Sequence, residues 1–256
     1  MKIALVLTVK NEARILRDNL RYHNAIGVDH IFVYFDNSTD TGRASINDLD
    51  FVTVTNSVSL EKYQHQSILD KFTSHAEEHH TARQCLNTYD ALQLCREQNY
   101  DWLISLDADE LVCTDKENPS NLLSFFSEID ATIDVVNFKT FEALQRKEAY
   151  GNVFAEETLY KTTYQYKGRL EKLRKDLYNP FTDAKQIFSF WYGQHMGKGA
   201  IRTSSKLIPH NVHRFKLENG QAANTVNAGM IMHYHVYDAQ DFIKKFTNFS
   251  DHPIPF

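Results

Sequence analysis

The chain is poor in cysteine. It has 256 residues and three cysteines, Cys85, Cys95 and Cys113, whose spacing matches no zinc or iron–sulfur pattern. An odd number also prevents complete pairing into disulfides within one chain. The sequence therefore predicts a protein of a reducing compartment, held together by packing and not by a disulfide framework.

Proline and glycine are scarce too, with five and nine residues. Disordered, collagen-like and linker-rich chains need far more of one or both, so these classes are excluded. Hydrophobic residues make up 42% of the chain and charged residues 24%, as in ordinary globular proteins. A chain of this length and composition can bury one large core.

Long apolar runs are missing. The apolar run at residues 3–9 is too short for a signal peptide, and no run approaches the roughly 18 residues that cross a bilayer. We therefore expect a cytoplasmic protein. A position at the inner face of a membrane, by peripheral contact, stays open.

The chain has no excess of positive charge. Lys and Arg total 28 against 33 Asp and Glu, for a formal net charge of −5. Because a phosphate backbone is bound by a positive field, nucleic acid is not an expected partner. The basic run at residues 167–175 is typical of a solvated helix face. A site for an anionic acceptor or an acidic membrane surface is the alternative.

What the chain does contain is an alternation of strand and helix patterns. Strand-like apolar runs occupy residues 3–9, 30–35, 51–55, 102–106, 133–138 and 230–237, and helical spacing occupies residues 15–26, 82–92, 122–129 and 238–246. Asn11 is the expected N-cap of the first helix, and Gly27 its stop. The predicted fold class is α/β: a three-layer αβα sandwich with a mostly parallel central sheet, Rossmann-like in its first half.

Polar clusters follow three of the predicted strands, at residues 10–12, 36–40 and 107–110. In parallel sheets, ligands bind outside the carboxyl ends of the strands. Asp107 and Asp109 lie at i and i+2, so in an extended chain their carboxylates face one space and need a cation between them. Oxygen ligands of this kind suit Mg²⁺ or Mn²⁺. A pair of acids that only caps the next element is the alternative.

Four other side chains are candidates for the same site. Asp36 can accept hydrogen bonds from a nucleoside, or simply shape an Asx turn. Arg83, on the helix before the Asp107 strand, can meet a phosphate or remain a surface charge. His233 and His235 face the same way in a strand, so one of them is a possible third metal ligand, and packed core histidines are the alternative.

These residues resemble a known family. The opening segments 9–12 (VKNE), 22–23 (YH), 27–30 (GVDH) and 36–40 (DNSTD) are similar to those of family 2-like glycosyltransferases of GT-A fold, in particular the family 92-related branch. The later segments 102–111 (WLISLDADEL) and 233–234 (HY), followed by Asp241, Phe242 and Lys244, resemble the D-x-D-E segment and the C-terminal pattern of that group.

The resemblance implies transfer of a sugar from a nucleotide-diphosphate sugar, with UDP-sugar favoured, to a hydroxyl of a glycan or lipid-linked acceptor. It implies inversion, Mn²⁺ or Mg²⁺ as cofactor, and a role in surface glycan or polysaccharide synthesis. Residues 1–115 would be the nucleotide-sugar-binding half of a GT-A domain, and residues 116–256 its acceptor-binding and metal-completing half.

The resemblance and the strand-end positions together define the expected site. The expected donor-binding residues are Val9, Asn11, Glu12, Asp36, Arg83, Asp107 and Lys198. The expected metal ligands are Asp107, Asp109 and His233, with His235 as the alternate. The candidates for the catalytic base are Glu142, Glu156 and Glu157, in a stretch that matches the family poorly.

Two other functions stay open. A nucleotidyltransferase has a similar architecture and metal, but it would carry a Gly-rich phosphate loop after the first strand, where this chain has residues 10–13 (KNEA). A catalytically silent sugar-binding or scaffold domain is the other alternative, and the acids at Asp107 and Asp109 weigh against it.

Overall fold

The computed structural model describes residues 1–114, 120–162, 168–178 and 196–250. The strands are β1 (Ile3–Val9), β2 (His30–Phe35), β3 (Val52–Asn56), β4 (Trp102–Leu106), β5 (Glu110–Cys113), β6 (Val135–Ala143), β7 (Tyr160–Lys161), β8 (Gly199–Arg202), β9 (Leu207–Asn211), β10 (Arg214–Leu217) and β11 (Thr225–His233). The helices are α1 (Leu16–Ala25), α2 (Asp70–Thr73), α3 (His80–Glu97), α4 (Leu122–Ser127), α5 (Val153–Glu156), α6 (Arg169–Tyr178) and α7 (Ala239–Ser250), and short 3₁₀ turns are η1 (Ala44–Ile46), η2 (Leu60–Lys62) and η3 (Ser67–Leu69).

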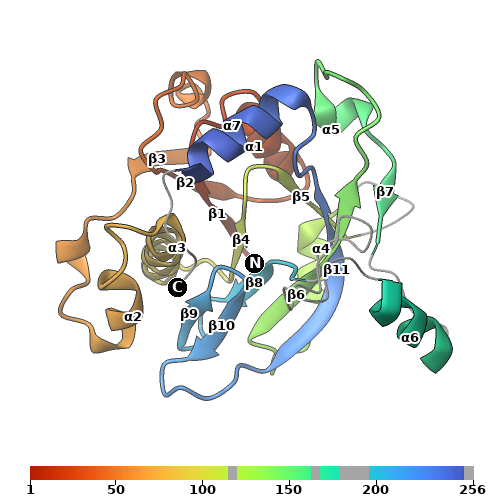
Figure 1. Ribbon diagram of the computed structural model, residues 1–256. Coiled ribbons are helices and arrows are strands. Elements are labelled where there is room, and N and C mark those ends of the chain that lie inside the picture. Colours follow the sequence, from red (N-terminus) through yellow and green to blue (C-terminus); the bar gives the residue numbers. More distant parts are fainter. Residues whose placement is uncertain (115–119, 163–167, 179–195, 251–256) are drawn as a thin grey trace.

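One large sheet organises the molecule (Figure 1). Its strand order is β3-β2-β1-β4-β8-β6-β11-β5, and β7 pairs with β6 beside this path. The four strands β3, β2, β1 and β4 are parallel, and β6 is parallel to β11. Strand β8 runs antiparallel between β4 and β6, and β5 runs antiparallel to β11. The predicted fold class, a mostly parallel α/β sheet, is confirmed.

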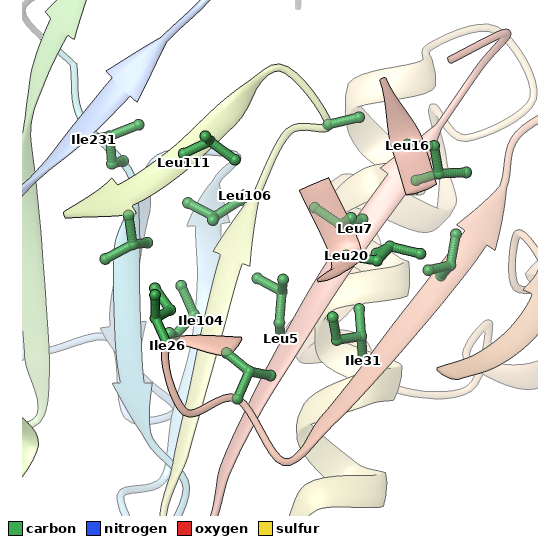
Figure 2. Close-up of a cluster of buried hydrophobic side chains, with 14 of the residues drawn as sticks. Leu5, Leu7, Leu16, Leu20, Ile26, Ile31, Ile104, Leu106, Leu111 and Ile231 are labelled. Atoms are coloured by element: carbon green, nitrogen blue, oxygen red, sulfur yellow. The ribbon is translucent and has the colours of Figure 1, made fainter. Parts of the chain in front are cut away.

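Helices cover both faces of this sheet because its central strands are apolar on both faces. Leu5 and Leu7 of β1 pack with Leu16 and Leu20 of α1, as Figure 2 shows, in a core that also includes residues of α4. The alternate β1 side chains join Leu92 and other residues of α3 in a second core on the opposite face. The period of two in a strand sends neighbours to opposite sides, which produces the three predicted layers.

The chain departs from expectation at Asn11. Its backbone has φ 58°, in the left-handed region, and α1 begins only at Leu16. The Asn11 side chain accepts a hydrogen bond from the Thr39 amide at 2.8 Å and not from its own helix. The predicted N-cap is therefore wrong: Asn11 ties the loop after β1 to the loop after β2, because a short amide side chain tolerates positive φ.

A second departure lies near the C-terminal end. Strand β11 ends at His233, earlier than predicted, and the chain turns at Val236, which has φ 50°. His235 thus lies beyond the strand, in the turn that leads to α7. The basic run at residues 167–175 is helical from Arg169 onward, in α6, and residue 167 lies outside the described residues. No helix in the described ranges is long and apolar enough to cross a bilayer.

Candidate active site

The three polar clusters predicted from strand ends meet in one cleft. A cavity of about 290 Å³ opens where β1, β2 and β4 end, beside α7. The expected site residues that line it are Val9, Glu12, Asp36, Asp107, Asp109, His233 and His235. The convergence follows from the sheet topology, since parallel strands end at the same edge.

Asp109 is held in the cleft by two basic side chains. Its side chain is about one-tenth exposed, and Lys245 Nζ lies 2.6 Å and His233 Nε2 3.6 Å from its Oδ2. Burial alone would raise the pKa of Asp109, but the positive charges of Lys245 and His233 hold the pKa well below its usual range. Asp109 is therefore an anion set among cations.

His233 reaches Asp109 through strand pairing. In the antiparallel β5–β11 ladder, His233 is the register partner of Glu110, and the Tyr234 amide donates to the Asp109 carbonyl at 2.8 Å. Burial lowers the pKa of His233, but the Asp109 charge outweighs it, and the net shift is upward. The ladder thus places a residue from the C-terminal part beside the polar loop that follows β4.

Three of the expected ligands form a cluster that fits a metal ion. Ligand atoms of Asp109, His233 and His235 all lie within 4.8 Å of one another. Nδ1 of His233 is buried without a hydrogen-bond partner among the described residues. One carboxylate and two imidazoles suit Mn²⁺ better than Mg²⁺, which prefers oxygen alone. These residues fit the predicted cofactor.

Asp107 points elsewhere. Its Oδ2 lies 2.8 Å from Lys198 Nζ, and its Oδ1 accepts a hydrogen bond from Gln84 at 2.6 Å. The expected extended conformation is absent: β4 ends at Leu106, and the chain turns between the two acids, so each carboxylate contacts a different lysine. Both acids nonetheless line the cleft. The role of Asp107 as a metal ligand stays a prediction.

The Lys198 side chain is 1% exposed and serves as the counterion of Asp107. The carboxyl of Glu110 lies on the same side, where it accepts a hydrogen bond from the Asp107 amide at 2.8 Å. Burial raises the pKa of Glu110 to about 7, although the Lys198 charge opposes this. Lys198 was expected to bind the donor, and the structure places it as an internal charge that supports the acids.

Asp36 and Arg83 form a buried pair. Arg83 Nε and Nη2 donate to the two Asp36 carboxylate oxygens at 2.6 and 2.9 Å, and Asp36 is 3% exposed. Ser57 also donates to Asp36 at 3.1 Å. A second cavity of about 460 Å³ borders the pair, lined by Phe35 and the loop that follows it. The guanidinium of Arg83 thus orients Asp36 at the boundary between the two cavities.

Of the three base candidates, only Glu142 lies near the metal cluster. Glu142 ends β6, with Oε1 3.9 Å from His233 Nδ1 and Oε2 3.0 Å from Lys161 Nζ. None of the three candidates lines the cleft itself, and Glu142 is set apart only by its distance to His233. Glu156 is held by Lys147 at 2.6 Å. Glu157 is buried in contacts of its own. It is 2% exposed and accepts hydrogen bonds from Arg146 and Tyr150, as a structural ion pair does.

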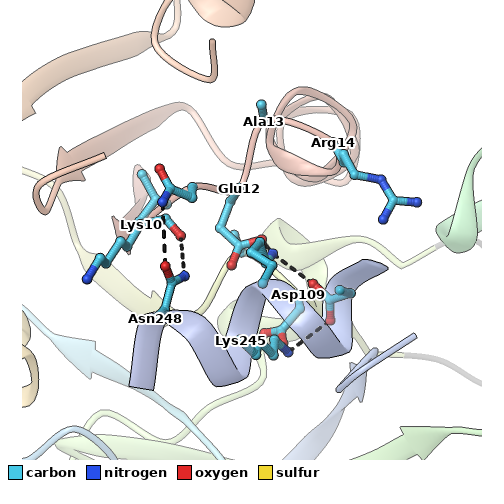
Figure 3. Close-up of polar contacts among 12 residues, drawn as sticks. Lys10, Glu12, Ala13, Arg14, Asp109, Lys245 and Asn248 are labelled. Atoms are coloured by element: carbon cyan, nitrogen blue, oxygen red, sulfur yellow. Dashed lines mark hydrogen bonds and ion pairs between the residues drawn. The ribbon is translucent and has the colours of Figure 1, made fainter. Parts of the chain in front are cut away.

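Helix α7 contributes site residues to which sequence reasoning assigned no role: Lys244 was seen only as part of the family motif, and Lys245 and Asn248 were missed. Lys245 contacts Asp109 (Figure 3), and the neighbouring Lys244 contacts Glu12 at 2.6 Å. Burial raises the pKa of Glu12 to about 7, with Lys244 opposing the shift. One turn further on, Asn248 Oδ1 accepts a hydrogen bond from Asn11 Nδ2 at 3.5 Å. The spacing i, i+4 between Asp241 and Lys245 was the available signal, since it places both on one helix face.

Comparison with known proteins adds to this geometry. Two glycosyltransferase-like proteins of Arabidopsis thaliana are 26% identical over 133 residues and 22% identical over 204 residues. The matches cover 52% and 76% of this chain but only 25% and 44% of those proteins, so the chain spans less than half the length of either relative.

Solved structures of sugar-transferring enzymes are also similar. Mannosyl-3-phosphoglycerate synthase from Rubrobacter xylanophilus has a TM-score of 0.43 at 16% identity, over 95% of this chain and 70% of that one. Glucosyl-3-phosphoglycerate synthase from Mycobacterium tuberculosis, in complex with Mn²⁺, UDP and phosphoglyceric acid, has a TM-score of 0.39 at 14% identity, over 100% and 80%. A sequence model of glycosyltransferase family 92 matches residues 6–254, which confirms the resemblance seen in the motifs, and the chain therefore belongs to glycosyltransferase family 92.

Proposed function

We propose that the chain transfers a sugar from a nucleotide-diphosphate sugar, UDP-sugar by preference, to an acceptor hydroxyl, with Mn²⁺ or Mg²⁺ as cofactor. The observation that carries the proposal is the cluster of Asp109, His233 and His235 inside the main cleft. A divalent cation held there would neutralise the diphosphate as it leaves. Membership of family 92 favours this reaction over nucleotidyl transfer.

We further propose that the chain has a donor side and an acceptor side, formed by residues 1–115 and 116–256. Residues 1–115 supply Asp36 and Asp109, from strand ends of the Rossmann-like half. Residues 116–256 supply His233 and Glu142, from the end of the sheet where β6 and β11 pair in parallel. We infer that the nucleotide lies against the first half and the acceptor against the second, with the cation between them.

Glu142 is the proposed catalytic base of an inverting reaction. A base must lie within hydrogen-bond reach of the acceptor hydroxyl, and Glu142 is the one candidate of the three beside the cluster. A role as the carboxylate that orients His233 is the competing assignment, because its Oε1 faces His233 Nδ1 at 3.9 Å. The two roles predict different defects when the carboxylate is replaced.

Donor and metal binding are tested by thermal unfolding with UDP-, GDP- and CMP-sugars, with and without Mn²⁺. We expect stabilisation by a UDP-sugar only when Mn²⁺ is present, because the cation bridges protein and diphosphate. Asp109→Asn should abolish the shift, and Asp50→Asn, at an exposed aspartate, should retain it. A shift that is independent of Mn²⁺ or survives Asp109→Asn contradicts the proposed cofactor. Binding without donor hydrolysis or transfer would favour a silent sugar-binding domain.

The role of Glu142 is tested by Glu142→Gln, with Glu156→Gln as the matched control, because Glu156 pairs with Lys147 and has no contact with His233. As the base, Glu142 should be needed for turnover while the Mn²⁺-dependent thermal shift survives. Loss of the shift together with turnover would assign Glu142 to the orientation of His233 instead. Inversion is checked from the anomeric configuration of the first-formed product by proton NMR.

A lipid-linked acceptor is favoured over a free glycan by the surface of α6. Leu170, Leu173 and Leu177 are 82%, 54% and 71% exposed, at positions i, i+3 and i+7 of a helix rich in Lys and Arg. Such a helix can lie on an anionic membrane, at the inner face proposed for a surface-glycan enzyme. Sedimentation with anionic vesicles should carry the protein down, whereas Leu173→Glu should leave it in solution. Equal sedimentation of both contradicts this contact.

A further inference from the structure

Helix α7 packs in an unusual orientation, with its polar side against the protein. Asp241 is its buried residue, at 1% exposure, while Phe242, Ile243 and Phe246 are 48%, 65% and 58% exposed. None of the apolar residues described in this helix belongs to a hydrophobic core. The helix is therefore held mainly by charged and polar contacts, and its position depends on the charges of the cleft.

The polar contacts of α7 are made with residues of the proposed site. Lys244 Nζ lies 2.6 Å from Glu12, and Lys245 Nζ lies 2.6 Å from Asp109. At the start of the helix, Arg14 holds Asp238 at 2.6 Å. Figure 3 shows α7 lying across the loop after β1, with Lys245 directed toward Asp109. The helix thus contacts the same carboxylates that a donor complex would use.

The ammonium of Lys245 lies within the candidate metal cluster. Besides Asp109 Oδ2, it lies 3.4 Å from His235 Nδ1, so it contacts two of the three candidate ligands. A divalent ion bound by Asp109 would approach the same oxygen to about 2 Å. An ammonium and a divalent cation at such separation repel one another strongly in a partly buried site.

We propose that Lys245 is an internal competitor of the divalent cation, which binds Asp109 only when the lysine side chain moves away. The inference rests on the proposed metal-dependent function and deepens it. Lys245 stabilises the Asp109 carboxylate while no metal is bound, and the protein gives up this ion pair when the metal arrives. The affinity for metal is therefore lower than the ligand set alone would provide.

Direct measurement of Mn²⁺ binding tests the competition, by calorimetry or by the EPR signal of free Mn²⁺, in the whole chain without donor. Lys245→Met removes the competing charge at nearly constant length, and we expect Mn²⁺ to bind about tenfold more tightly or better. Lys245→Gln should change affinity in the same direction. Lys245→Arg keeps the charge and should bind no more tightly than the original chain.

Lys244→Met is the matched control, because it removes the same charge from the same helix without touching Asp109. Its effect on Mn²⁺ affinity should be much smaller than that of Lys245→Met. Unchanged or weaker Mn²⁺ binding by folded Lys245→Met and Lys245→Gln, with the original chain binding Mn²⁺ in the presence of UDP, overturns the competition alone. Absence of Mn²⁺ binding in every variant, even with UDP, overturns the proposed metal dependence as well.

Discussion

The two partners of the Lys198–Asp107 ion pair differ in exposure, so we expect their single substitutions to differ in cost. The Lys198 side chain is 1% exposed and that of Asp107 40% exposed, although their charged atoms are 2.8 Å apart. Removing either partner leaves the other behind, and the cost depends on how well water can solvate what remains. The two single substitutions should therefore destabilise the fold by different amounts.

Asp107→Asn leaves a buried ammonium. Breaking a buried pair costs about 3 to 5 kcal/mol, and Glu110, whose pKa of about 7 allows it to ionise, offsets part of this. We expect a loss of about 3 kcal/mol in the free energy of unfolding. Lys198→Met leaves a carboxylate that water and Gln84 still solvate, so we expect about 1 to 2 kcal/mol.

The assay is urea unfolding at pH 7, followed by tryptophan fluorescence and by circular dichroism, whose transitions should coincide. The double variant Lys198→Met/Asp107→Asn should lose less than the sum of the single losses, because the pair is coupled. Lys206→Met, at an exposed lysine, should change stability by less than about 0.5 kcal/mol. A loss for Lys198→Met that equals or exceeds that for Asp107→Asn, or strict additivity, would refute the reasoning.

Buried His23 should make the fold sensitive to acid, because burial lowers its pKa to about 4. As the pH drops from 6.5 to 4, the unfolded chain binds a proton that the folded chain does not, so the free energy of unfolding decreases by roughly 3 kcal/mol in total. Unfolding at several pH values should give a flatter acid limb for His23→Gln, and parallel limbs would contradict this origin. Gly197→Ala should lower the free energy of unfolding by about 3 kcal/mol or more, because an added Cβ would lie 1.7 Å from the Phe138 carbonyl oxygen. A melting temperature within a degree of the original would contradict this, since it would mean that the backbone shifts at little cost. Arg83→Gln should lower the free energy of unfolding by about 3 kcal/mol, because it leaves Asp36 buried without its counterion. The double variant Arg83→Gln/Asp36→Asn should recover part of this loss. Additive losses in denaturant unfolding would contradict the coupling.

Sequence alone was sufficient for the frame of this protein. Strands buried on both faces appear in the sequence as continuous apolar runs. The polar residues that follow such parallel strands lie at one edge of the sheet. The position of the cleft, with Asp36 and Asp109 in its wall, followed from these local patterns. The family motifs carried the same information, and the family was confirmed over residues 6–254.

The partners of each charge were decided only by tertiary structure. A sequence shows that Glu142, Glu156 and Glu157 are carboxylates, but not that the end of β6 brings the first of them beside His233. Likewise Asp107 and Asp109 look equivalent two residues apart, yet a turn directs them to different cations. The directions of side chains in turns depend on backbone angles that short polar sequences do not specify.

The role of Lys245 illustrates the same limit most clearly. It contacts Asp109 across 136 positions of the chain, through a helix whose polar side faces inward. Helical periodicity predicts that one face is apolar and the other charged, and the usual assumption is that the apolar face is buried. Here the acids of the cleft attract the charged face, and only the folded molecule, where the carboxyl ends of distant strands concentrate negative charge, determines which face turns inward.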